Sequence, residues 1–167
     1  MLFNSYIFLL CFLPLCLAGY FLLNRFGLKT LALIFLLGMS LWFYGSNTPV
    51  YLILIVSSVL VNYGFYRLST VLTGDKPRRW ARIFAVAVNL GVLFYFKYYD
   101  FFVETVNSVF GSDWTLKHIM LPLGISFFTF QQISFVVDSF NGEVRDCSLL
   151  DYACFVTFFP QLIAGPI

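Results

Sequence analysis

The feature of this sequence that most constrains its fold is a series of long apolar runs that contain no charged residue. No Asp, Glu, Lys or Arg occurs in residues 1–24, 30–66 or 119–137. A helix that crosses the hydrocarbon core of a bilayer needs about 20 mostly apolar residues, so the second run is long enough for two crossings. Charged residues make up 11% of the chain, against roughly a quarter in soluble domains. The sequence therefore predicts an all-α, polytopic helical membrane protein and excludes a soluble domain.

Turn residues and charges divide this chain into a set of predicted helices within a single transmembrane region, residues 1–167. We predict membrane helices at about 6–23, 30–44, 50–72, 80–99, 122–140 and 149–163, and an interfacial helix at about 101–110. Pro14 predicts a kink in the first helix, and Pro122 suits the first position of the fifth. The first helix is expected to stay uncleaved, because no Lys or Arg precedes Arg25 as a signal peptide would require.

The last predicted helix carries helix-breaking residues near its end. Pro160, Gly165 and Pro166 all fall within the final eight residues, which predicts a break around Phe159 and a non-helical turn at membrane depth. Such backbone persists only where protein buries it or water reaches it.

The positive charges are distributed unevenly between the predicted loops. Arg25 and Lys29 follow the first run and a basic group follows the third, whereas 45–49 carries no charge; the basic group comprises Arg67, Lys76, Arg78, Arg79 and Arg82. The positive-inside rule then places loops 24–29 and 73–80 in the cytoplasm, and the amino terminus and loop 45–49 outside. Because these charges flank apolar spans, we interpret them as topology signals, and no nucleic-acid partner is expected.

Neither the cysteines nor the single histidine forms a recognisable metal site or catalytic site. No two of the four cysteines form a Cys-x-x-Cys pair, and His118 is the only histidine, so the spacing of zinc ligands is absent. His118 follows Lys117 at a predicted membrane surface, where we expect an ordinary interfacial residue and not a catalytic base.

The predicted helix at 122–140 carries its polar residues in a narrow stripe. At 100° per residue, one side holds Gly124, Phe127, Gln131, Ser134 and Asp138. Unpaired polar groups are costly in hydrocarbon, so the stripe should face protein or a wet cavity. Gln131, Ser134 and Asp138 are thus candidate cavity-lining residues. Two interpretations stay open, packing against another helix and lining a substrate path.

Three motifs carry a resemblance to a known family. They are LPLGISFFTFQ at 121–131, Asp138 with Gly142 four residues later, and FFPQLIAGPI at 158–167. With these motifs the chain resembles the membrane-bound O-acyltransferase (MBOAT) family. It looks most like the bacterial branch that acylates cell-surface polymers, such as the alginate O-acetylases and D-alanyl-transfer proteins. The resemblance implies the amino-terminal part of an MBOAT-type helical fold.

The resemblance also implies an activity and its partners. The family transfers an acyl group, here expected to be acetyl from acetyl-CoA, to hydroxyls of an extracellular polysaccharide or cell-wall polymer, with or without a periplasmic partner. It implies a location in the bacterial inner membrane. The family's catalytic histidine lies beyond Ile167, so we expect no catalytic residue in residues 1–167 and no activity of this fragment alone. No bound cofactor or metal is expected, and the residues that would bind the donor are unknown.

The residues themselves leave a second class of function open. Helices interrupted by Gly and Pro are also typical of transporters, so a membrane transporter or channel subunit is the alternative. No nucleophile with an adjacent base is visible in this chain. The preference for an acyltransferase therefore depends on the resemblance.

Overall fold

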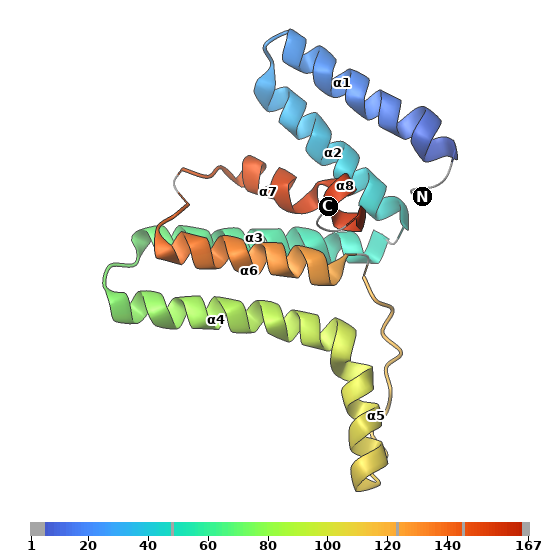
Figure 1. Cartoon of the computed structure of the whole chain (residues 1–167), viewed down its shortest axis with the longest axis vertical. Coiled ribbons are helices and arrows are strands. Elements are labelled where there is room, and N and C mark those ends of the chain that lie inside the picture. The colour runs from blue at the N-terminus through green and yellow to red at the C-terminus, as the bar shows by residue number, and fades with distance from the viewer. Residues whose placement is uncertain (1–5, 48, 123, 145, 165–167) are drawn as a thin grey trace. The chain divides into compact units, whose positions relative to one another are not determined.

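Helices form all the regular structure of the residues described here. The computed structural model describes residues 6–47, 49–122, 124–144 and 146–164, and it assigns no strand within them (Figure 1). Four helical segments of this part are long and apolar enough to cross a bilayer: Phe8–Arg25, Lys29–Ser46, Pro49–Val71 and Asp75–Phe110. The predicted all-α, polytopic membrane fold is confirmed.

The chain forms two compact units. The first unit comprises residues 1–64 together with 144–167, and the second comprises Phe65–Glu143. Helix α3 (Pro49–Val71) contributes its first part to the first unit and its last two turns to the second.

The first unit is built around aromatic rings from three distant segments. Its elements are the π-helical turn η1 (Phe8–Phe12), α1 (Leu13–Arg25), α2 (Lys29–Asn47), part of α3, α7 (Leu149–Thr157) and α8 (Phe159–Ala164). Figure 1 shows α1 and α2 side by side. The buried cluster consists of Phe8, Phe12, Cys16, Met39, Phe43 and Phe159. Its centre is Phe159, whose ring lies 5.2 Å from Phe12 and 5.7 Å from Phe43, centroid to centroid.

The backbone near Pro14 adopts a wider turn than an α-helix. The N–H of Leu13 donates to the carbonyl of Phe8, five residues back, and Pro14 then occupies the first turn of α1. Pro14 has no N–H to donate to a carbonyl of the preceding turn, so one helical hydrogen bond is missing where the wider turn occurs. The irregularity predicted at Pro14 thus appears as the π-helical turn that precedes it.

The second unit packs two antiparallel helices against each other. It contains the end of α3, α4 (Asp75–Leu93), the π-helical turn η2 (Phe94–Tyr98), α5 (Tyr99–Phe110) and α6 (Ile125–Asn141). Helices α4 and α6 lie side by side (Figure 1). Their shared core holds Ala85, Val136 and Phe140, with Phe65, Leu72, Ala81 and Phe135 packed against it.

Helix α4 begins earlier than the sequence pattern predicted, and η2 and α5 continue it without a break to Phe110. We expected its start at Trp80, but it begins at Asp75, after Gly74 with φ +101°. Pro77 is accepted because it lies in the first turn. The segment predicted as a separate interfacial helix is α5, which joins α4 through η2 without a loop, and the ribbon bends at this junction (Figure 1).

The helix predicted from Pro122 begins three residues later, at Ile125. The carbonyl of Pro122 accepts the N–H of Ile125 at 3.2 Å, and Gly124 has φ +70°, so these residues form a turn that precedes the helix. Helix α6 has 17 residues, slightly fewer than the roughly 20 that span a bilayer.

The last predicted helix is broken at Phe158, one residue before the expected position. Pro160 has no N–H to donate to the preceding turn, so α7 ends and α8 begins with the proline in its first turn. Helix α7 has nine residues, which at 1.5 Å per residue is too short to span. The turn predicted at 165–167 lies outside the described residues.

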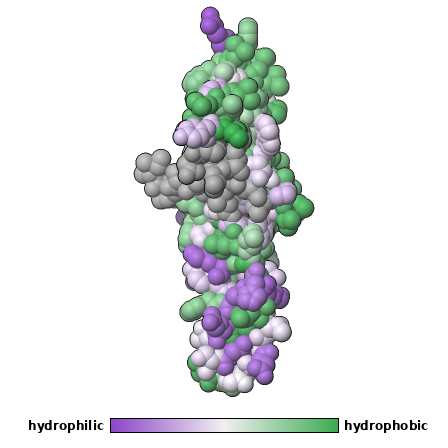
Figure 2. Space-filling model, turned by 90° about the vertical axis from the view of Figure 1, so that its right-hand side faces the viewer, coloured by the Kyte–Doolittle hydropathy of each residue, from purple (hydrophilic) through white to green (hydrophobic). Residues whose placement is uncertain are grey.

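Much of the surface of the first unit is apolar. Figure 2 shows nearly continuous hydrophobic residues over α1 and α2, in the upper part of the view, and a mixture over α5 and the segment that follows it. Exposed side chains on α1 and α2 include Leu15, Phe21, Leu22, Leu31 and Ile34. Soluble proteins rarely expose apolar patches of this extent, so this surface is suited to lipid or to further helices.

The aromatic cluster gives a test of the first unit. Replacing Phe159→Ala in the intact protein should lower its stability by about 3–5 kcal/mol, as expected for a buried Phe that leaves a cavity. The thermal unfolding midpoint in detergent would measure the change. The control is Phe155→Ala, because Phe155 is 46% exposed and should tolerate truncation. Equal midpoints for the two variants would show that Phe159 does not hold α8 in place.

Candidate functional site

The buried face of α6 is not the face that carries the polar stripe. The buried residues of α6 are Ile125, Phe128, Thr129, Gln132, Val136, Ser139 and Phe140. At 100° per residue, this face is centred roughly 140° around the helix from the stripe. Two polar residues that lie off the stripe, Thr129 and Gln132, are therefore more deeply buried than Gln131, Ser134 or Asp138.

The three candidate cavity-lining residues have different environments. Ser134 is exposed, and its hydroxyl donates to Oδ2 of the half-buried Asp138 at 3.3 Å. Gln131 is half-buried, and neither its amide nitrogen nor its amide oxygen has a hydrogen-bond partner among the described residues. The structure thus pairs Ser134 with Asp138 and leaves the amide of Gln131 unused. Whether the three line a cavity stays a prediction.

The end of α6 is closed by backbone and arginine hydrogen bonds. Gly142, at φ +82°, lets its own N–H reach Ser139 O and the N–H of Glu143 reach Asp138 O, the pattern of a Schellman cap. The carbonyl of Phe140 takes no part in that cap. Instead it accepts Nη2 of Arg78 at 2.8 Å. A cation is also favourable here because the carboxyl end of a helix carries partial negative charge.

A basic cavity lies between the start of α4 and the end of α6. Its volume is about 270 Å³, and it is lined by Asp75, Arg78, Arg79, Arg82 and Phe140; we call it the arginine pocket. Arg82 donates Nη1 to Oδ1 of Asn141 at 2.7 Å. The sequence analysis assigned these arginines to topology alone and missed the pocket, because nothing in the pattern shows that α6 ends beside them.

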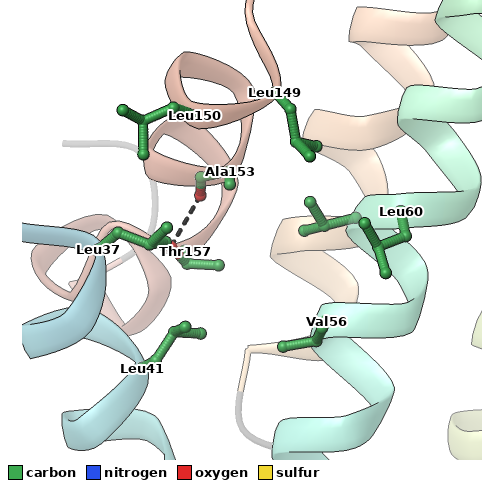
Figure 3. Close-up of a pocket in the computed structure, with 9 residues that line it drawn as sticks. Leu37, Leu41, Val56, Leu60, Leu149, Leu150, Ala153 and Thr157 are labelled. Carbon is green, nitrogen blue, oxygen red and sulfur yellow. Dashed lines mark hydrogen bonds between the residues drawn. The ribbon is translucent and has the colours of Figure 1, made fainter. Parts of the chain in front are cut away.

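A second cavity, in the first unit, is wholly apolar in character. It measures about 400 Å³ and is lined by Leu37, Leu41, Val56, Val59, Leu60, Leu149, Leu150, Ala153 and Thr157. Figure 3 shows that these side chains come from α2, α3 and α7. Its one hydroxyl, Thr157 Oγ1, donates to the carbonyl of Ala153 at 2.7 Å. This cavity can accommodate hydrocarbon, and it offers no group for acid–base chemistry.

His118 lies on a surface loop organised by Asp100. The carboxylate of Asp100 accepts the N–H of Lys117 at 2.8 Å and that of Ile119 at 2.9 Å, and His118 between them has φ +47°. Its side chain is exposed. Within the described residues, no three His, Cys, Asp or Glu side chains come together as a possible metal site.

Comparison with known proteins gives consistent matches over the whole chain. It is 36% identical to a peptidoglycan O-acetyltransferase of Helicobacter pylori and 38% identical to a probable alginate O-acetylase AlgI of Pseudomonas aeruginosa. A probable alginate O-acetylase AlgI of Azotobacter vinelandii is 37% identical. Each match covers 100% of this chain and 37%, 32% and 34% of the respective relative, so the chain spans about a third of their length. No family model and no solved structure matches the chain. The resemblance to bacterial polymer O-acyltransferases is confirmed.

The unused amide of Gln131 gives a test of the site. Gln131→Leu in the intact protein should leave the thermal unfolding midpoint unchanged or raise it, because a buried amide without a partner costs about 1–3 kcal/mol. The baseline is Ile133→Leu, a swap of one half-buried apolar residue for another on the same helix. A clear drop for Gln131→Leu alone would show that the amide has a structural partner outside the described residues.

Proposed function

We propose that this chain is part of a membrane-bound acyltransferase that moves acetyl groups onto hydroxyls of an extracellular polysaccharide or cell-wall polymer. The observation that carries the proposal is similarity along the entire chain to proteins named for O-acetyl transfer to two different polymers, peptidoglycan and alginate. Both names describe O-acetyl transfer to a polymer. The proposal therefore specifies acetyl transfer and a polymer acceptor, and it does not specify which polymer. A periplasmic partner that relays the acetyl group is compatible with this scheme.

The proposed topology separates donor from acceptor. In the inner membrane, with the amino terminus outside, the positive-inside rule puts the loop at 73–80 in the cytoplasm, where acetyl-CoA would bind. The acceptor polymer would be on the other side. Acetyl transfer then needs a path through the bilayer lined by polar groups.

Helix α6 supplies polar groups suited to such a path. Ser134 and Asp138 form a hydrogen-bonded pair that the described residues leave partly exposed. A carboxylate facing lipid is costly, so in the membrane another part of the protein or water should cover the pair. The amide of Gln131 offers a donor and an acceptor to a passing ester or hydroxyl. These roles are binding roles.

The proton chemistry would be carried out elsewhere in the protein. No nucleophile with an adjacent base is visible in the sequence, and His118 lies on an exposed loop. We place the general base on the histidine that the resemblance implies beyond Ile167. General acid–base help of that kind typically contributes 10²–10⁴ in rate.

The alternative, a transporter or channel subunit, is favoured by one observation. The two π-helical turns and the break at Phe158 interrupt otherwise apolar helices, and transporters use broken helices at their binding sites. Movement of a solute across the membrane without any acetyl transfer would identify a transporter or channel subunit.

Acetyl transfer is directly measurable. Membranes containing the intact protein should move labelled acetyl from acetyl-CoA to a polysaccharide acceptor, and residues 1–167 alone should move none. Gln131→Leu and Asp138→Leu should reduce the rate by at least about tenfold if each removes one hydrogen bond to the reacting groups. Ile133→Leu is the control. Equal rates in all variants would remove α6 from the path, and transfer by residues 1–167 would place the catalytic groups here.

The orientation can be tested separately with single cysteines in a cysteine-free background. Lys76→Cys should react only with membrane-permeant maleimides in intact cells, because loop 73–80 is expected in the cytoplasm. Thr48→Cys should react with impermeant reagents as well. The opposite labelling pattern would reverse the proposed topology.

A further inference from the structure

The arginine pocket carries more positive charge than its structural role requires. Arg78 and Arg82 hold the end of α6 through a carbonyl and an amide oxygen, both neutral acceptors. Within the described residues, none of the three lining arginines forms an ion pair with a carboxylate. Asp75 is the one acidic residue that lines the pocket, so three guanidinium charges face one carboxylate. We propose that this pocket binds the phosphate group of an anionic ligand.

The guanidinium geometry suits phosphate. Arginine stays protonated, is weakly hydrated and presents five N–H donors in a planar fork that matches phosphate oxygens in pairs. Arg78 and Arg82 each use one nitrogen to hold α6, which fixes both side chains and leaves their other N–H groups available. The ligand would therefore meet two donors already held in position, at a low cost in side-chain entropy.

Arg79 provides a third and more mobile donor. It lines the pocket, it is exposed, and no hydrogen bond holds it to the rest of the described chain. The pocket also lies at the amino-terminal end of α4, whose first turn has no side-chain cap. The free backbone N–H groups and positive dipole of a helix start favour an anion and oppose the partial negative charge at the end of α6.

Two sources of phosphate fit the position of the pocket. One is the headgroup of an anionic phospholipid, and Trp80, 72% exposed beside Arg79, is the kind of residue found at headgroup level. The other is the phosphates of coenzyme A, a source that rests on the proposed acetyl transfer. The second source requires the pocket to face the cytoplasm. The shared chemistry is a phosphate held by two fixed arginines and one mobile arginine.

The experiment uses the intact protein and one pair of variants. Arg79→Gln removes a pocket charge without cutting a hydrogen bond within the chain, and Lys76→Gln removes an equal charge from the same exposed turn outside the pocket. In one arm, native mass spectrometry measures retention of phosphatidylglycerol over phosphatidylcholine from mixed nanodiscs. In the other, calorimetry measures the affinity for coenzyme A and for inorganic pyrophosphate in detergent.

We expect Arg79→Gln to weaken binding of at least one phosphate probe by about tenfold, as for the loss of one charge-assisted hydrogen bond, and Lys76→Gln to change it less than about twofold. An effect on phosphatidylglycerol alone identifies a lipid site, and an effect on coenzyme A alone a donor site. Equal weakening by both variants would show diffuse attraction and overturn the proposal, as would unchanged binding of every probe. If the intact protein transfers no acetyl group, the retention of phosphatidylglycerol still tests whether the arginine pocket binds a phosphate group.

Discussion

The structure depends on one constraint, which is that backbone N–H and C=O groups have no water to bond with inside a bilayer. Two irregularities among the described residues keep backbone groups bonded locally. The π-helical turn before Pro14 keeps the backbone bonded where a proline enters. At the end of α6 the Schellman cap at Gly142 pairs the carbonyls of Asp138 and Ser139, and Arg78 pairs that of Phe140. The apolar surface tolerates these breaks because each is closed from within the protein.

The two units differ in the chemical groups that their side chains offer. The first unit contributes aromatic packing and an apolar cavity, neither of which offers groups for polar chemistry. The second unit carries the unused amide of Gln131, the Ser134–Asp138 pair and the arginine pocket. The pocket and the polar stripe meet on the same helix, since the carbonyl that Arg78 binds is two residues beyond Asp138. The proposed acetyl transfer would use these two elements, an anchor for a charged donor and a polar route for the acyl group.

Run length predicts the helical fold well, because it follows from the thickness of the bilayer. Local backbone chemistry is harder to predict. Pro122 suited a helix start, but the left-handed Gly124 delays that start to Ile125, and no propensity rule weighs the two together. The stripe on α6 was recognisable from spacing, whereas the burial of Thr129 and Gln132 depends on which neighbour packs there. The arginine pocket could not be predicted, because it joins residues about sixty positions apart.

The π-helical turns have a consequence for how this chain tolerates changes in length. A turn closed over five residues contains one residue more than an α-helical turn. Phe8, Phe12 and Cys16 follow one another at intervals of four, and all three remain in the same buried cluster across η1. Deleting one residue from η1 would restore regular α-helix with little rotation of the parts before and after it, because the wider turn uses one extra residue to complete about one turn. A single deletion in such a turn should therefore be milder than one in regular α-helix, where it would rotate a whole apolar face by about 100°.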